Sequence, residues 1–479
     1  FRKNRFIGKK MNNYSANRWL KNLLIHLLAF YKLAISPYIT TQCSYSETCS
    51  QYSKRSISEK GIILGILMTF LRLISCSFDP LLRYFQKIRI KLIYLVTPMI
   101  LFLFVSCMSF SYEGGWSDIV YLEDEDSFFV TTNKGKLHKF NIKDGIPNAN
   151  WSYPKESKHT SYSDPIFYEN SVISSIFSCR GNSCEGEIFQ LNIKTGELEW
   201  NINTLSKISS KMAINNDILS YSTLKKQDEV SNDKEAEIHF VSLSGKNYET
   251  LGKIILEGEN WTGINLFDEK FIVSTLDGWI YSLDANIDKN KNISMEDLLL
   301  DSKKFPYSIN SPLTYHENRI YFSDVGGMFY SVNINNFDDS SSVEIDNWMI
   351  SSPIFHNGDI YVFTVNGDLI VLSDSNLQLK NKFSTEKIIV GDSKLVSYDS
   401  GEYILIPTEK SGIEVLSNKE SDFAESQGNY STDKKIYSSP LLNKDNLLIH
   451  TQNGEILFFR LKSRDLFYCL DLNEGKICD

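Results

Sequence analysis

The chain has 479 residues, of which 42% are hydrophobic and 23% charged, and its net charge is −9. This length allows two or three domains and a large buried core, which excludes a scaffold too small to fold unaided. The net charge hides an uneven distribution, because residues 1–111 carry +13 and the remainder carries −22. The basic segment favours anionic lipid or nucleic acid, and the acidic remainder suits an exported soluble domain. Of the two partners for the basic segment, we expect lipid and no nucleic acid.

Two apolar runs with helical spacing stand in the basic segment. The first runs from Trp19 to Tyr31 and stops at Ser36-Pro37, and the second runs from Ile62 to Ile74. Neither reaches the roughly 20 apolar residues of a transmembrane helix. We therefore predict helices that lie on a membrane surface, with two core helices of a small soluble domain as the alternative.

A compact motif accompanies these runs. Its residues are Cys43, Thr48, Cys49, Ser50, Tyr52, Gly61, Gly65, Arg72, Cys76, Asp79 and Pro80. Over about residues 20–82 the motif resembles the membrane protein insertion efficiency factor family (YidD), although Glu47 replaces a family proline and Ser75 replaces an arginine. The resemblance implies a peripheral protein on the cytoplasmic side of the plasma membrane. Its implied partners are the inner-membrane insertion machinery and anionic lipid.

Three cysteines of the motif raise the question of a metal site. Cys43, Cys49 and Cys76, with His26, provide four zinc-ligand side chains, but they lack the paired C-x2-C or C-x4-C spacing of zinc sites. We expect reduced packing thiols in a cytoplasmic segment, no metal and no catalytic residue.

A second targeting signal follows at residues 86–107. Basic residues precede an apolar run from Leu92 to Val105, which is the length of a secretory signal core. Phe104-Val105-Ser106-Cys107 resembles a lipobox, which implies lipidation at Cys107. The alternative is an uncleaved signal anchor, which gives the same topology.

From Gly115 onward, short runs rich in Ile, Val, Phe, Tyr and Thr alternate with glycine-containing turns. Recurring glycines stand at 135, 186, 278, 327, 367, 412 and 454, and a degenerate unit covers Ala236 to Leu243. Recurring openings such as Asp164-Pro165 and Ser352-Pro353 precede the runs. About eight units of 40–51 residues predict a β-propeller with about eight four-stranded blades. A solenoid is the alternative.

The repeat also carries Thr-Gly-x-x-x-Trp, as at Thr195 to Trp200, and resembles the quinoprotein-type (PQQ-like) propeller repeat. A lipoprotein with such repeats resembles the outer-membrane assembly lipoprotein family (BamB), which implies binding to envelope proteins. Quinoprotein dehydrogenases share these blades, so a quinone enzyme is the alternative; the sequence lacks their adjacent-cysteine pair. We expect a protein-binding module without enzymatic activity or cofactor.

Two further cysteine pairs lie in the acidic part. Cys179 and Cys184 bracket a predicted hairpin tip, and Cys469 and Cys478 lie near the C-terminus. Short, even spacing in an exported domain predicts two disulfides, with four free thiols as the alternative.

Together these patterns predict a mainly β chain with three parts. A helical membrane-associated domain (residues 11–85) and a lipoprotein signal segment (86–107) precede an extracytoplasmic, lipid-anchored propeller (112–479). Two rival interpretations are a lipoprotein scaffold whose first 90 residues matter little, and the product of two adjoining genes read as one frame. Met11 is a plausible start, so residues 1–10 are predicted to be foreign to both units.

Overall fold

The computed structural model describes residues 49–77 and 117–478, apart from 144–145, 158, 181–182, 209–210, 225–234, 400, 410, 420–421 and 437. The chain divides into two compact units, Phe1–Tyr112 and Glu113–Asp479. Within the described ranges, no helix combines the length and the apolar character needed to cross a bilayer. The predicted helix at Trp19–Tyr31 and the signal segment 86–107 lie outside the described residues.

The described part of the first unit is a helical hairpin of α2 (Cys49–Lys60) and α3 (Ile62–Ser77). Gly61 separates the helices with a φ of +84°, a backbone conformation that glycine adopts at little cost. Gly65 lies where the two helices touch, because a Cβ atom there would be only 2.5 Å from the Cα atom of Ile57. Among the side chains of α2 that the structure describes, Ile57, Ser53 and Ser56 are buried.

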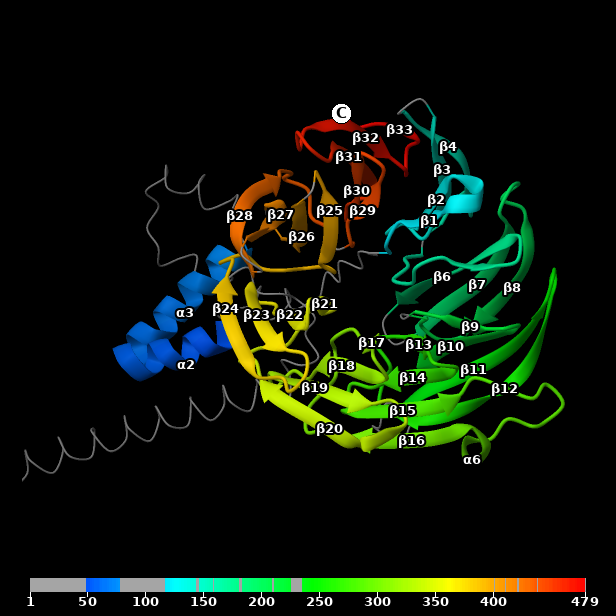
Figure 1. Cartoon of the computed structure of the whole chain (residues 1–479), viewed down its shortest axis with the longest axis horizontal. Helices are drawn as coiled ribbons and strands as arrows, with labels where there is room; N and C mark the ends of the chain where they lie inside the picture. The colour runs from blue at the N-terminus through cyan, green and yellow to red at the C-terminus, as the bar shows by residue number, and fades with distance from the viewer. Residues whose placement is uncertain are drawn as a thin grey trace, which may run out of the picture. The chain divides into compact units, whose positions relative to one another are not determined.

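The second unit is a β-propeller of eight antiparallel sheets, called blades 1 to 8 in chain order (Figure 1). This confirms the predicted mainly β fold and the number of blades. Two short helices, η2 (Glu123–Glu125) and α6 (Met295–Leu298), lie in blades 1 and 4.

Blades 1 to 4 contain strands β1 (Val120–Leu122), β2 (Ser127–Thr131), β3 (Leu137–Lys143), β4 (Ile146–Tyr153); β5 (Ile166–Tyr168), β6 (Ser171–Arg180), β7 (Ser183–Asn192), β8 (Leu198–Thr204); β9 (Ala213–Asn215), β10 (Ile218–Leu224), β11 (Glu235–Ser244), β12 (Asn247–Glu257); β13 (Ile264–Phe267), β14 (Lys270–Ser274), β15 (Trp279–Asp284) and β16 (Leu299–Lys304). Blades 5 to 8 contain β17 (Thr314–His316), β18 (Arg319–Ser323), β19 (Met328–Asn333), β20 (Asn336–Glu344); β21 (Ile354–His356), β22 (Asp359–Phe363), β23 (Asp368–Ser373), β24 (Leu379–Ser384); β25 (Lys394–Tyr398), β26 (Gly401–Thr408), β27 (Gly412–Lys419), β28 (Asp422–Tyr430); β29 (Leu441–Asn443), β30 (Asn446–His450), β31 (Glu455–Arg460), β32 (Leu466–Asp471) and β33 (Lys476–Ile477).

Burial follows strand position within each blade. The second strand is packed on both faces by neighbouring blades, so all five residues of β2 are buried. The fourth strand has an outer edge, and five of the six residues of β24 are exposed. The tight turns between second and third strands place glycine at positive φ, as at Gly278 and Gly367. The blades form a rigid scaffold, so binding residues of the propeller are expected in the innermost and connecting segments.

One of the seven glycines predicted to mark a turn does not. Gly186 lies inside β7 and pairs with Phe177 of β6, so this hairpin extends beyond the predicted turn. A Cβ atom at Gly186 would be 2.5 Å from the Thr204 hydroxyl, so close approach of the outer strand is why glycine is needed there. The degenerate unit at Ala236–Leu243 is β11 of blade 3.

The ring closes by side-chain packing of blade 8 against blade 1, a junction that we call the seam. Figure 1 shows the red last blade beside the cyan first blade. Phe128 and Phe140 of blade 1 share one hydrophobic core with Leu448, Ile456 and Phe458 of blade 8. Each blade is one continuous stretch of sequence, because strands β1–β4 and β29–β33 each form their own sheet.

Candidate functional site

The structure places the motif residues unevenly. Tyr52, Gly61 and Gly65 are described in full, and the Arg55 guanidinium lies 5.6 Å from the ring centroid of Tyr52. Cys49, Ser50, Arg72 and Cys76 lie in α2 or α3, with side chains that are not described, whereas Cys43, Thr48, Asp79, Pro80 and Cys107 lie outside the described residues.

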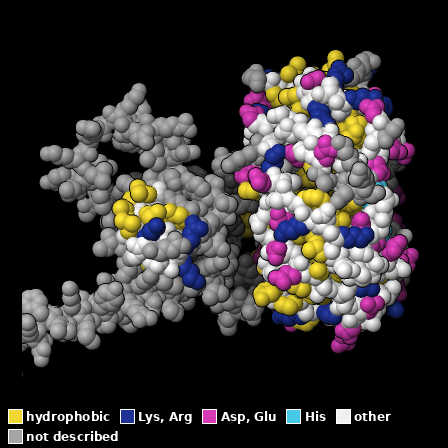
Figure 2. Space-filling view, turned by 60° about the vertical axis from the view of Figure 1, so that its left-hand side comes forward, with side chains coloured by type: hydrophobic (Ala, Val, Ile, Leu, Met, Phe, Trp, Pro, Cys, Tyr) yellow, Lys and Arg dark blue, Asp and Glu magenta, His cyan; other side chains and the backbone are white. Residues whose placement is uncertain are grey.

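The hairpin presents an apolar stripe on α3. Leu64, Leu67 and Leu71 recur at helical spacing and are 52%, 51% and 57% exposed. The neighbouring helix exposes Lys54, Arg55 and Lys60. Figure 2 shows hydrophobic side chains gathered on the described part of this unit, with Lys and Arg side chains beside them. An apolar stripe with basic neighbours suits the interface of an anionic membrane.

In the second unit, four charged side chains from blades far apart in sequence interact electrostatically at the propeller channel. Each stands two residues before the first strand of its blade: Asp118 in blade 1, Asp164 in blade 2, Lys211 in blade 3 and Asp392 in blade 7. Lys211 interacts electrostatically with Asp392 as well as with Asp164 and Asp118. Blades 3 and 7 lie opposite each other in a ring of eight, so only the central channel brings these residues together.

The three carboxylates connect neighbouring blades. Asp164 accepts a hydrogen bond from the Asp118 amide (2.7 Å), and Asp392 accepts one from the Ser352 amide (2.6 Å). Across the seam, Asp118 accepts from both the amide and the hydroxyl of Ser439, each at 2.7 Å. Each carboxylate thus accepts a hydrogen bond from the preceding blade in the ring, so the cluster links neighbouring blades.

Burial and like charge shift the protonation of this cluster. Burial, followed by the charge of Asp118, raises the pKa of Asp164 to about 6. Burial and Asp118 also raise the pKa of Asp392. The Asp164 carboxylate raises the pKa of Lys211, whose ammonium lies 3.5 Å away and is half open to solvent. The channel therefore combines the Lys211 cation with two carboxyl groups, Asp164 and Asp392, whose raised pKa values favour the protonated form.

Two histidines are buried at the seam. His138 of β3 and His450 of β30 are 5% and 1% exposed. The Nδ1 atom of His450 lies 2.8 Å from the carbonyl oxygen of Ser117, so Nδ1 carries the proton and donates it. Among the described residues, the Nε2 atoms of both histidines are buried without a hydrogen-bond partner. Burial lowers both pKa values, that of His138 to about 3.

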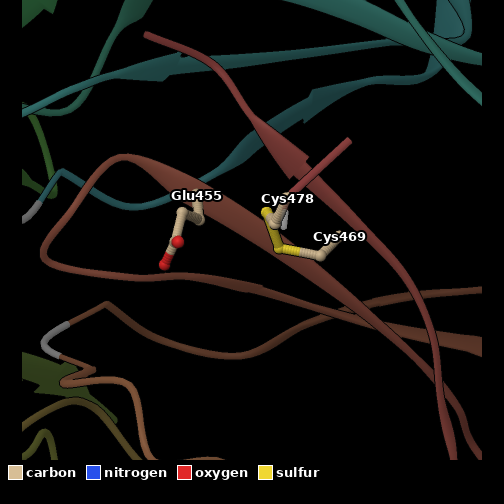
Figure 3. Close-up of side chains that lie close together, drawn as sticks. All are labelled: Glu455, Cys469 and Cys478. Carbon is tan, nitrogen blue, oxygen red and sulfur yellow. A yellow bond between two sulfur atoms is a disulfide. The ribbon is translucent and has the colours of Figure 1, made fainter. Parts of the chain in front are cut away.

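The structure joins the two cysteine pairs of the second unit. Cys179 and Cys184 link the tips of β6 and β7, and Cys469 and Cys478 hold the C-terminus against β32. Figure 3 shows Glu455 beside the second disulfide, a grouping that resembles a metal site. Both sulfurs are bonded to each other, and Glu455 pairs with the Lys434 ammonium at 3.0 Å. The group is therefore a disulfide beside an ion pair, and its sulfurs and carboxylate already have partners.

Sequence reasoning missed the channel cluster. Asp164 stands in the recurrent opening Asp164-Pro165, which is a usable signal, but Ser117-Asp118 lacks the proline. Asp392, like Asp118 and Asp164, stands two residues before the first strand of its blade, where blade 3 carries Lys211. Their meeting depends on closure of the ring, which no local pattern encodes.

Comparison with known proteins assigns the first unit. The family described as "Putative membrane protein insertion efficiency factor" (YidD) matches residues 20–81. Curated members of that name include a Pelagibacter ubique protein, 35% identical over 77 residues, which are 14% of this chain and 93% of that protein. A Rickettsia massiliae protein of the same name is 42% identical over 58 residues, which are 12% of this chain and 71% of the relative.

Solved structures resemble the second unit in fold. BamB from Moraxella catarrhalis aligns with a TM-score of 0.53 at 12% identity, covering 71% of this chain and 95% of that one. The computationally designed Ika8 protein aligns with a TM-score of 0.53 at 11% identity, covering 73% and 97%. At these identities the similarity establishes the propeller fold only.

Proposed function

Because residues 20–81 match the YidD family and the chain covers most of the length of its curated relatives, this chain belongs to the membrane protein insertion efficiency factor family, and we propose that its first unit raises the yield of proteins inserted into the inner membrane. The observation that carries the proposal is the family motif on a hairpin whose exposed stripe of Leu64, Leu67 and Leu71 is flanked by basic side chains. The segment acts from the cytoplasmic face. Its +13 charge favours anionic lipid by about 1 kcal/mol for each basic side chain close to the surface.

We further propose that residues 86–107 export the propeller and that Cys107 anchors it by lipid. The basis is the charged and apolar sequence of this segment and its lipobox-like end. Cleavage before Cys107 would leave two separate products. Experiments on the whole gene therefore need antibodies to each half.

For the propeller we propose binding to other envelope proteins, without quinone chemistry. In the linkers between blades, Leu205 is 79% and Tyr307 55% exposed, so apolar contact groups stand on a rigid ring. The channel carboxylates Asp118, Asp164 and Asp392 bond backbone amides of neighbouring blades, which favours a structural role over cofactor binding. The fold shared with Moraxella BamB adds support by analogy.

Deletion of residues 11–85 is expected to lower the yield of an inserted multi-spanning membrane protein severalfold, because the proposed lipid-bound factor is lost. Insertion is measured by protease protection of a labelled substrate in cells. The deletion keeps the signal segment 86–107, so export of the propeller is followed in the same cells as the matched control. Unchanged insertion in the deletion, together with a wild-type first unit found only in the soluble fraction, would contradict the proposal.

Protein binding by the propeller is tested with a surface charge. In cells that express the whole gene, Leu205→Glu is expected to reduce crosslinking of the propeller to envelope proteins at least tenfold, because a charge cannot enter an apolar contact. Leu300→Glu, on the outer strand β16, is the control, since Leu300 is also an exposed leucine (50%) but lies away from the linkers. Stoichiometric uptake of pyrroloquinoline quinone with calcium, followed by alcohol-dependent dye reduction, would instead establish an enzyme.

A further inference from the structure

Three potential metal ligands converge at the junction of blades 5 and 6, away from the channel cluster and the seam. His316 ends β17, Glu317 follows it in the turn, and Asp374 follows β23 of the next blade. One ligand atom from each side chain lies within 4.8 Å of the others. Glu317 is exposed, and the other two are partly buried.

Packing fixes the direction of two of these ligands. The His316 ring stacks on Phe355 with centroids 4.1 Å apart and planes 19° apart. Its Nε2 atom lies 3.7 Å from Oδ2 of Asp374. The other carboxylate oxygen, Oδ1, accepts a hydrogen bond from the Tyr321 hydroxyl at 3.3 Å. A hydrogen bond that holds a carboxylate in this way is typical of metal ligands, and the stacking limits rotation of the His316 ring.

The separation suits an ion better than direct pairing. Zinc bonds to nitrogen and oxygen measure about 2.0–2.2 Å, so two ligand atoms in a tetrahedral shell lie about 3.3–3.5 Å apart. The 3.7 Å between Nε2 of His316 and Oδ2 of Asp374 needs only a small contraction. Two carboxylates would neutralise a divalent ion, and imidazole with carboxylate is a ligand set that zinc accepts.

The next blade provides a matched contrast. His356 ends β21 as His316 ends β17, and it also faces a carboxylate of the following blade. Its Nε2 atom lies 3.1 Å from Glu402 and 2.8 Å from the Asn357 amide nitrogen, so it has direct partners. An asparagine stands after it where Glu317 follows His316.

We propose that His316, Glu317 and Asp374 bind one divalent transition-metal ion, zinc by ligand chemistry, with water completing the shell. Because the ligands come from two blades, the bound ion joins blade 5 to blade 6. This site is independent of the proposed membrane and protein-binding functions.

Metal-stripped full-length protein is titrated with zinc against a chromophoric chelator. His316→Phe, which preserves ring stacking on Phe355, is expected to bind one equivalent fewer than wild type, whereas His356→Phe keeps the wild-type number. Glu317→Gln, at an exposed position that folding does not need, is expected to weaken that equivalent at least tenfold, and zinc should raise the unfolding temperature of wild type but not of His316→Phe. Equal stoichiometry and affinity in wild type, His316→Phe and Glu317→Gln would overturn the proposal, as would loss of the same equivalent in His356→Phe.

Discussion

Gly65→Ala is expected to unfold the α2–α3 hairpin and reduce membrane insertion to the level of the deletion of residues 11–85. An added Cβ atom would lie 2.5 Å from the Cα and 2.6 Å from the amide nitrogen of Ile57, and 2.8 Å from the carbonyl carbon of Ser56. All three are backbone atoms, so a side-chain rotation cannot relieve the contact. On helix propensity alone, alanine would stabilise α3 by about 1 kcal/mol, so the expected sign is opposite to that of an exposed site.

Limited proteolysis within residues 49–77 measures the hairpin directly, and the insertion assay measures its consequence. Leu67→Ala is the matched control, because Leu67 is 51% exposed on the same helix. It should keep the hairpin resistant to protease and weaken only membrane association. Wild-type protease resistance and full insertion in Gly65→Ala would show that the helices do not approach at this position.

Acidification is expected to destabilise the propeller at its seam, and His138→Gln should remove a defined part of this effect. The folded pKa of His138 is about 3, below the ordinary value of 6.5, so its contribution is fully present above pH 6.5 and is lost as the pH falls through about 3. Between pH 7 and pH 5 the loss is about 2 kcal/mol, because each pKa unit corresponds to about 1.4 kcal/mol. The groups that act on this ring are Lys136 and His450, and Asp118 acts on His450.

Chemical unfolding of full-length protein at pH 7 and pH 5, followed by tryptophan fluorescence, gives the two free energies for each protein. Wild type should lose about 2 kcal/mol more than His138→Gln over this interval. Asp164 acts in the opposite sense, since a folded pKa of about 6 makes its contribution present below about pH 4 and lost as the pH rises through 6. It is common to both proteins and cancels in the comparison. Equal losses would exclude His138 as the acid-sensitive group.

Repetition explains why the blades were predictable. Turn glycines such as Gly278 and Gly367 must adopt positive φ, so each hairpin leaves a local mark in the sequence. The same reasoning failed at Gly186, which forms no turn. Glycine is needed there because Thr204 of the outer strand leaves no room for a Cβ atom. Because glycine is needed both for positive φ in turns and for close approach of strands, a recurring glycine does not by itself identify a turn.

The channel and the seam could not be predicted in this way. Asp118 accepts a hydrogen bond from Ser439, which is 321 positions away in the sequence. Lys211 interacts electrostatically with Asp392, which belongs to the opposite blade of the ring. Such contacts arise only when the eight blades close, and a buried His138 looks like any strand histidine in the sequence. In the first unit the motif identifies the family, while the contact at Gly65 required coordinates because it depends on how the two helices cross.

The seam also fixes an order of events for a chain that is synthesised from its N-terminus. Every blade is an uninterrupted segment, so each four-stranded sheet can be completed from residues that have already emerged. Docking of β29–β33 onto β1–β4 requires the last strands, which makes ring closure the final step of maturation. Until then Phe128 and Phe140 lack their partners from blade 8, so a stalled or truncated chain would expose these apolar side chains to other proteins.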